Sequence, residues 1–158
     1  MVKIKFEDLK KRKKEYLGFD YTCEEDCIKE LENNGLALKY IKNQTEELCL
    51  KAVKQDGMAL QFVQNQTEAI CIEAVEQEGW ALGFVQNQTE KICLAALKKF
   101  PDSLVLVRNQ TEEICLAAVK EEGGALQFVR NQTEAICFEA VKQNSMAAKF
   151  IQSKAFNP

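Results

Sequence analysis

A fixed period of 22 residues constrains this chain more than any other feature of its sequence. The stretch 65–86 reads NQTEAICIEAVEQEGWALGFVQ, and 14 of its 22 positions are identical in the stretch 43–64. The same unit begins again at residues 87, 109 and 131, and a divergent copy without the NQT triplet begins at Cys23. Self-similarity at one short period is typical of arrays in which each unit packs on its neighbours. We therefore expect a stacked repeat architecture.

The first half of each unit predicts an α-helix of about three turns. In the unit 43–64, Thr45 is suited to the N-cap, and two glutamates follow it in the first turn, where the helix dipole favours negative charge. Leu48, Cys49, Ala52 and Val53 then form one apolar stripe at helical spacing.

The second half of the unit predicts a second, shorter helix. Gly57 is expected to end the first helix as a residue with positive φ. Ala59, Leu60, Phe62 and Val63 then form the apolar side of a helix of about two turns. Helices below about 12 residues are marginal in water on their own. The predicted fold class is therefore all-α, an α-solenoid of about six helix-turn-helix repeats stabilised by stacking.

The predicted domain organisation has three parts. Residues 1–20 form an N-terminal capping helix, because an end unit must cover the open core. The array itself spans residues 21–152, and residues 153–158 are a C-terminal tail. The six predicted repeats are 23–42, 43–64, 65–86, 87–108, 109–130 and 131–152.

The capping helix carries a strongly basic run, residues 10–14, with sequence KRKK after the first lysine. Asp26 and Glu30 in the first repeat share a helix face, because they are four residues apart. We expect this face to meet the basic leader instead of another repeat. The alternative is that the leader docks an acidic partner.

The fourth repeat departs from the pattern at the turn. The sequence KKFPDS, residues 98–103, stands where other units have a glycine turn. Pro101 is expected to end the first helix, because the residue before a proline avoids the helical region. Asp102 or Ser103 is then expected to cap a second helix over residues 104–108.

Six of the seven cysteines occupy one repeat position. Equivalent helices in a stack lie about 8–10 Å apart, and a disulfide needs Cα atoms within about 7 Å, so neighbouring thiols should stay unpaired. Cys23 and Cys27 are four residues apart, but the chain has no histidine, and zinc sites need four ligands. We expect buried thiols, no metal and no cofactor. The six are Cys27, Cys49, Cys71, Cys93, Cys115 and Cys137.

An odd number of cysteines and an N-terminus without an apolar signal segment indicate a reducing compartment. The predicted location is the cytoplasm, or the cytosol of a host cell into which the protein is delivered. No apolar run approaches the roughly 20 residues of a membrane span.

The NQT triplets match the acceptor pattern for N-glycosylation, but all five are copies of one repeat position. The threonine is explained as an N-cap. For the asparagine we expect a ladder of side chains that bond loop backbone between repeats.

Nothing in the chain predicts catalysis. There is no histidine to act as a general base, no glycine-rich phosphate loop, and no serine or cysteine beside an activating group. The net charge of −3 also disfavours a general nucleic-acid binder. We expect a protein that is not an enzyme.

The most variable position directly follows the turn glycine, and stacking should align it along one edge with Phe100 close by. Met58 and Met146 are expected to pack on the preceding helical turn. Trp80 is expected to serve as an interface anchor, since it is too large for a pocket that Gly124 also occupies. The row is Leu36, Met58, Trp80, Asp102, Gly124 and Met146.

The last residues of the six repeats form a second row. They are Lys42, Gln64, Gln86, Arg108, Arg130 and Gln152. Polar residues at fixed spacing could read one nucleotide per repeat. Glutamates recur nearby in the chain, so a solvated face is the favoured interpretation.

The pattern Glu-Ile-Cys-Leu-x-Ala-Val, followed by Gly-x-Ala-Leu-x-Phe-Val, is clearest in residues 113–129. It resembles the short helical repeats of a domain family of unknown function, family 4116. The resemblance covers about residues 23–152, and the chain departs from the family in its tight spacing, its NQT leader and its cysteine. Such repeats occur in bacterial and large-virus proteins, often in tandem. The resemblance implies a helical array with an interaction role and no catalytic residues.

The leading hypothesis is a non-catalytic module that binds a protein partner, as a scaffold, inhibitor or adaptor. The candidate contact residues are Trp80, Phe100, Met58, Arg108 and Arg130. One alternative is single-stranded nucleic-acid binding through Lys10–Lys14 and the two arginines. Another is a structural spacer or assembly unit.

Overall fold

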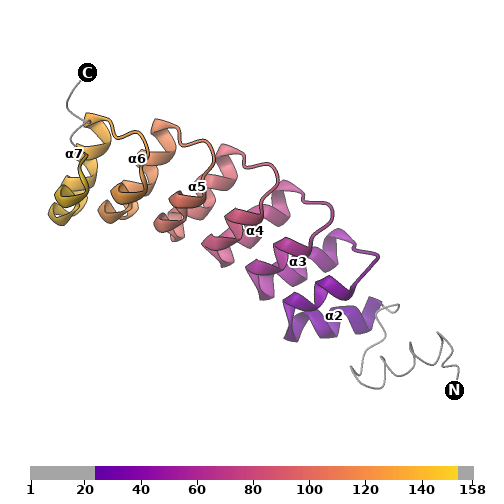
Figure 1. The fold of residues 1–158 in the computed structure, drawn as a ribbon. Helices are drawn as coiled ribbons and strands as arrows, with labels where there is room; N and C mark the ends of the chain where they lie inside the picture. The colour runs from indigo at the N-terminus through magenta and orange to yellow at the C-terminus, as the bar shows by residue number, and fades with distance from the viewer. Residues whose placement is uncertain (1–23, 153–158) are drawn as a thin grey trace, which may run out of the picture.

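The computed structural model describes residues 24–152, which form an elongated row of six units (Figure 1). Each unit is a ten-residue α-helix followed by a six-residue 3₁₀-helix. The units are α2 (Glu24–Asn33) with η1 (Gly35–Tyr40), α3 (Glu46–Gln55) with η2 (Gly57–Phe62), α4 (Glu68–Gln77) with η3 (Gly79–Phe84), α5 (Glu90–Lys99) with η4 (Pro101–Leu106), α6 (Glu112–Glu121) with η5 (Gly123–Phe128), and α7 (Glu134–Gln143) with η6 (Ser145–Phe150).

The predicted all-α solenoid is confirmed, and residues 24–152 contain no strand. The second helix of each unit is a 3₁₀-helix of two turns, because 3₁₀ geometry takes three residues per turn. The predicted capping helix over residues 1–20, the tail over 153–158 and Cys23 lie outside the described residues.

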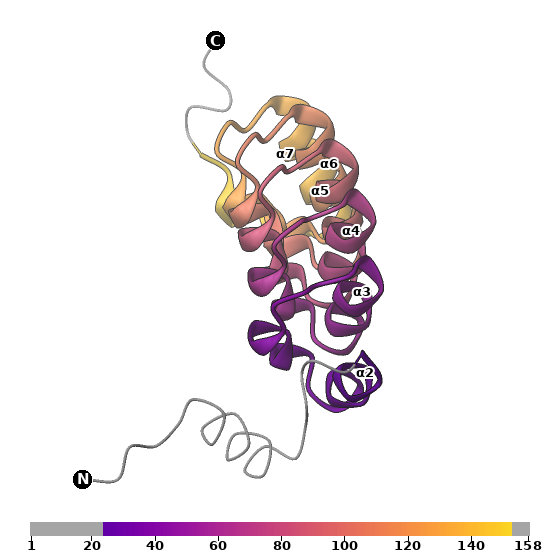
Figure 2. The same cartoon turned by 90° about the vertical axis from the view of Figure 1, so that its right-hand side faces the viewer.

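The helices form two layers (Figure 2). Each α-helix contacts the α-helix of the next unit, and each 3₁₀-helix contacts the next 3₁₀-helix. Each α-helix also packs on the 3₁₀-helix of its own unit and, from α3 onward, on that of the preceding unit. Contacts therefore run between nearest neighbours, as in other helical repeat arrays.

A continuous apolar core lies between the two layers. Leu48, Cys49, Ala52 and Val53 are buried in α3, which confirms the predicted stripe. Leu60 in η2 and its equivalents in the first five units are completely buried. These equivalents are Leu38, Leu60, Leu82, Leu104 and Leu126.

Threonine caps the α-helices of units two to six, as predicted. The Thr67 hydroxyl accepts a hydrogen bond from the backbone N–H of Ile70 (3.4 Å). The same hydroxyl donates to the Glu46 carboxylate of the preceding unit (2.9 Å). One side chain thus starts a helix and contacts the neighbouring unit.

The prediction that Gly57 ends the first helix with a positive φ is wrong. The last residue of α3 is Gln55, and its C-cap residue, Asp56, has an extended backbone (φ −150°). Gly57 is the first residue of η2, and its φ is not positive. A Cβ atom at Gly57 would lie 2.5 Å from the Ala74 carbonyl oxygen and 2.8 Å from the Glu78 Cβ. The glycine is needed because the next unit approaches so closely that no side chain fits.

The predicted asparagine ladder is also wrong, because the neighbouring glutamine performs that role. Gln66 Nε2 donates to the carbonyls of Leu60 (3.3 Å) and Phe84 (3.0 Å), and its Oε1 accepts from the Gln86 N–H (2.9 Å). These groups lie at the C-terminal ends of two consecutive 3₁₀-helices, and the Leu60 carbonyl also accepts from the Val63 N–H (3.1 Å). Asn65 is exposed, whereas the half-buried Gln66 lies between the two ends. Equivalent bridges are made by Gln44, Gln88, Gln110 and Gln132.

The fourth unit also differs from its prediction. The second helix begins at Pro101 instead of residue 104, and its N-cap residue, Phe100, makes no side-chain cap. Proline fits the first helical position because its fixed φ suits a helix and its missing N–H has no helical partner there. Ser103 is buried inside η4, and its hydroxyl donates to the Phe100 carbonyl (2.7 Å).

Substitution of Gly57 by alanine should destabilise the array by about 1–3 kcal/mol, because the new Cβ overlaps backbone of the next unit. Gly83→Ala is the matched control, since the nearest atoms to its Cβ would be Leu106 methyl groups at 3.8 Å. Urea unfolding followed by circular dichroism measures both. Equal midpoints for the two variants would contradict the packing role of Gly57.

Removal of the Gln66 side chain by Gln66→Ala should cost about 1–2 kcal/mol, because the Phe84 carbonyl and the Gln86 N–H lose their bonds to this side chain, and the Leu60 carbonyl keeps only its bond from the Val63 N–H. Asn65→Ala, one residue earlier, should leave the unfolding free energy nearly unchanged. Thermal and urea unfolding would compare the pair. A larger loss for Asn65→Ala would restore the asparagine ladder.

Candidate functional site

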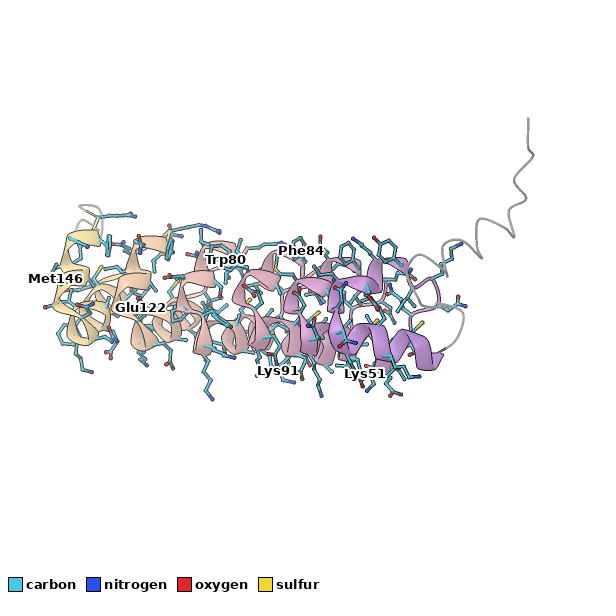
Figure 3. The ribbon with its side chains drawn as sticks, turned by 90° about the horizontal axis from the view of Figure 1, so that it is seen from below. Lys51, Trp80, Phe84, Lys91, Glu122 and Met146 are labelled. Atoms are coloured by element: carbon cyan, nitrogen blue, oxygen red, sulfur yellow. The ribbon has the colours of Figure 1, made fainter. Side chains whose placement is uncertain are left out.

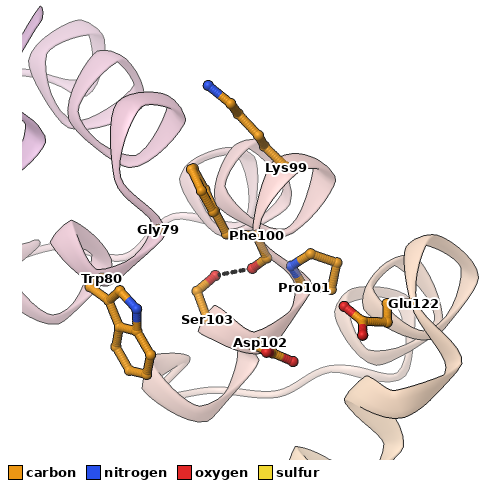
Figure 4. A pocket seen from close by; sticks show the side chains of 8 residues that line it. All are labelled: Gly79, Trp80, Lys99, Phe100, Pro101, Asp102, Ser103 and Glu122. Atoms are coloured by element: carbon orange, nitrogen blue, oxygen red, sulfur yellow. Dashed lines mark hydrogen bonds between the residues drawn. The ribbon is translucent and has the colours of Figure 1, made fainter.

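A hollow of about 240 Å³ opens at Pro101, where units three, four and five meet (Figure 4). We call it the Pro101 hollow. Its lining comes from η3, the C-terminal end of α5, η4 and the residue that follows α6. The lining residues are Gly79, Trp80, Lys99, Phe100, Pro101, Asp102, Ser103 and Glu122.

Pro101 cannot make a contact that joins the first unit to the second and the fifth unit to the sixth. The Gly35 N–H donates to Gln55 Oε1 (2.7 Å), and the Gly123 N–H donates to Gln143 Oε1 (2.7 Å). Pro101 stands at the same repeat position but has no N–H to donate. The equivalent of the accepting glutamine is Glu121, which cannot donate in return. The tie between units is therefore missing at the hollow.

The side chains beside the hollow form an unusually apolar surface. Trp80 is 54% exposed and Val105 is 42% exposed. Residues three apart lie on one face of a 3₁₀-helix, so Trp80 shares a face with Gly83, and Asp102 shares one with Val105. We call these four residues the η3–η4 face. Figure 3 shows Trp80 and Phe84 along one long edge, with Lys51 and Lys91 along the opposite edge.

The same 3₁₀ position is polar in every other unit, where it is Lys39, Gln61, Gln127 or Lys149. Gln61 Nε2 donates to the Met58 carbonyl (3.0 Å), and Gln127 Nε2 donates to the Gly124 carbonyl (3.2 Å). Gly83 and Val105 have no side-chain donor. The carbonyls of Trp80 and Asp102 therefore cannot receive this bond from their own helix.

Two carboxylates lie at the rim of the hollow. Asp102 and Glu122 extend toward one another beneath Pro101, while Lys99 points to the other side (Figure 4). Lys99 Nζ donates to the Glu76 carbonyl (3.0 Å). Among the described residues, the ion pairs are Lys51–Glu32, Lys91–Glu68 and Lys142–Glu139, so neither rim carboxylate has a cationic partner there.

The structure brings two of the five predicted contact residues together, since Trp80 and Phe100 both line the hollow. Met58 is half-buried in η2 and does not line it. Met146, expected to pack, is instead 65% exposed. Gly83 and Glu122 were not among the contact residues predicted from the sequence. Gly83 could have been found from the sequence, because most units have a polar residue at its repeat position.

Arg108 and Arg130 point back along the array. The two terminal guanidinium nitrogens of Arg108 donate to the carbonyls of Gln86 (2.9 Å) and Val85 (2.8 Å). Arg130 makes the same pair of bonds to Arg108 (3.0 Å) and Val107 (2.9 Å). Both arginines therefore tie consecutive units together.

Five cysteines of the described residues form a row of free, buried thiols: Cys49, Cys71, Cys93, Cys115 and Cys137. The Cys71 thiol donates to Gln66 Oε1 at 3.7 Å, so the cysteine also supports the glutamine bridge. Burial raises the pKa of Cys71, and the nearby Glu68 carboxylate raises it further. A raised pKa keeps the thiol protonated, and the thiolate is the reactive form.

The described residues contain neither a metal site nor a membrane-spanning helix. Within residues 24–152, no three or more Cys, Asp or Glu side chains gather as a metal site. In the same range, no helix has the length and apolar character of a membrane span.

The raised thiol pKa values predict a loss of stability at alkaline pH. The folded array retains thiol protons that the unfolded chain releases, so stability is full below an unfolded thiol pKa of about 8.5 and falls as the pH rises through the folded values. A Cys49→Ala/Cys71→Ala variant should show a shallower fall of Tm between about pH 8 and 10.5. The two proteins have all their other ionisable groups in common. An identical slope in the variant would contradict this linkage.

Comparison with curated proteins and with solved structures found no match. The profile of one family, described as Domain of unknown function (DUF4116), matches residues 45–88. This stretch runs from the N-cap of α3 through η3, which is two successive units of the array. The match bears out the resemblance of these two units to the short helical repeats of that family.

Proposed function

We propose that this protein is a non-catalytic module that binds a protein partner through the η3–η4 face and the Pro101 hollow. The observation that carries the proposal is Trp80, an aromatic residue more than half exposed beside a hollow. Tryptophan is among the residues that most often dominate the energy of protein interfaces.

The position of this surface supports the proposal. The units are near-copies, and Trp80, Val105 and the proline that replaces the turn glycine fall in two adjacent units. Phe138 and Met146 are also exposed, in the last described unit, but do not line the hollow. A purely structural spacer gains nothing from an exposed tryptophan beside a hollow. Contacts between the units preorganise the surface, which lowers the entropy cost of binding.

Nucleic-acid binding is less well supported. Arg108 and Arg130 each use two guanidinium nitrogens on backbone carbonyls of the preceding unit. The rim of the hollow carries Asp102 and Glu122, which would repel a phosphate backbone.

The free thiols suit a reducing compartment such as the cytoplasm. The five buried cysteines from Cys49 to Cys137 carry free thiols. Proteins that reside in oxidising compartments more often carry their cysteines as disulfides.

A Trp80→Ala/Phe100→Ala variant should lose capture of the native partner from a cell extract, because it removes both aromatic rings at the hollow. Quantitative mass spectrometry of captured proteins would compare it with the parent protein. Met146→Ala, which removes an exposed side chain in the last described unit, is the matched control. Circular dichroism should show equal helix content in all three. Unchanged capture by the double variant would exclude this surface.

A further inference from the structure

We propose that the partner segment carries an arginine side chain that enters the rim of the Pro101 hollow between Asp102 and Glu122, next to an apolar side chain that packs on Trp80 and Val105. This inference rests on the proposed function, because it specifies the chemistry of the partner at the same surface.

Charge complementarity selects a cation. Asp102 and Glu122 come from consecutive units and extend toward one another beneath Pro101 (Figure 4). Neither carboxylate has an ion-pair partner among the described residues. The one cationic residue in the lining, Lys99, points to the other side, and its Nζ donates to the Glu76 carbonyl. A guanidinium has enough donors to bond two carboxylates at once, whereas an anionic partner would be repelled.

The η3–η4 face selects an apolar neighbour for that arginine. Trp80 and Val105 are exposed on consecutive 3₁₀-helices, and a Cβ atom at Gly83 would lie in van der Waals contact with the Leu106 methyl groups, at 3.8 Å. An aliphatic or aromatic side chain on this face would remove the apolar area from water. The adjacent indole of Trp80 can also stack on the guanidinium plane.

The backbone of the face can hold an extended segment. The carbonyls of Met58 and Gly124 each accept a hydrogen bond from a glutamine side-chain amide. The equivalent carbonyls of Trp80 and Asp102 do not receive this bond. Backbone N–H groups of a bound segment can take this place. The three requirements together describe a short extended peptide with an arginine beside an apolar residue.

The test is selection of a randomised peptide library displayed on phage against the full-length protein. Enriched peptides are synthesised with arginine and with citrulline, its uncharged isostere, and their affinities are measured by isothermal titration calorimetry. The protein variants are Asp102→Asn, Glu122→Gln and Trp80→Ala. Glu113→Gln, an exposed carboxylate on α6 outside the hollow, is the matched control. Circular dichroism confirms the helix content of each variant.

We expect enriched peptides to carry arginine beside an apolar residue. Citrulline, Asp102→Asn and Glu122→Gln should each weaken binding about tenfold, as expected for loss of a charge-assisted hydrogen bond. Glu113→Gln should have no effect. If the peptides require Trp80 but bind equally well with citrulline in place of arginine, the proposed arginine contact is contradicted and the proposed function is not. Peptides indifferent to Trp80→Ala, or a library without enrichment, would overturn both.

Discussion

Contact between consecutive units is the interaction on which this structure depends. Helices of ten and six residues cannot remain folded alone in water, so each must bury its apolar side against its neighbours. Two devices bring the units close enough. Glycines such as Gly57 remove the side chain where backbone meets backbone, and glutamines such as Gln66 satisfy the backbone groups at the ends of two successive 3₁₀-helices. The cysteine row belongs to the same system, because four of its thiols donate to those glutamines.

The candidate site lies where this system is interrupted. Pro101 replaces the glycine and removes its N–H, so the fourth unit lacks one bond to the fifth, and a hollow remains. Phe100 still packs closely against Gly79 of the third unit. Within the fourth unit, the Ser103 hydroxyl donates to the Phe100 carbonyl. The interruption is therefore local. A regular array has the same surface everywhere, and a departure of this kind gives one junction a chemistry of its own.

Much of the fold could be predicted from the sequence, and less of the site. The threonine caps, the apolar stripes and the unpaired cysteines follow from local spacing, which repetition makes unambiguous. Trp80 could be chosen because its size conflicts with Gly124 at the same repeat position. The choice of glutamine over asparagine could not be made, since both are adjacent amides and only the path of the backbone decides which one points inward. The role of Gly57 was misassigned for a similar reason, because a glycine for close approach and a glycine for positive φ look the same in a sequence.

The sequence by itself determined the period, the helical character of each unit and the need for stacking, because these depend on residue spacing and on helix length. Only the tertiary structure decided which groups meet across the junctions. It directed Arg108 and Arg130 onto backbone carbonyls of the preceding units, and it placed Asp102 opposite Glu122. Those pairings join residues about 20 positions apart, and their geometry depends on the offset between units. That offset is set by how closely the backbones can pack, which no single unit encodes.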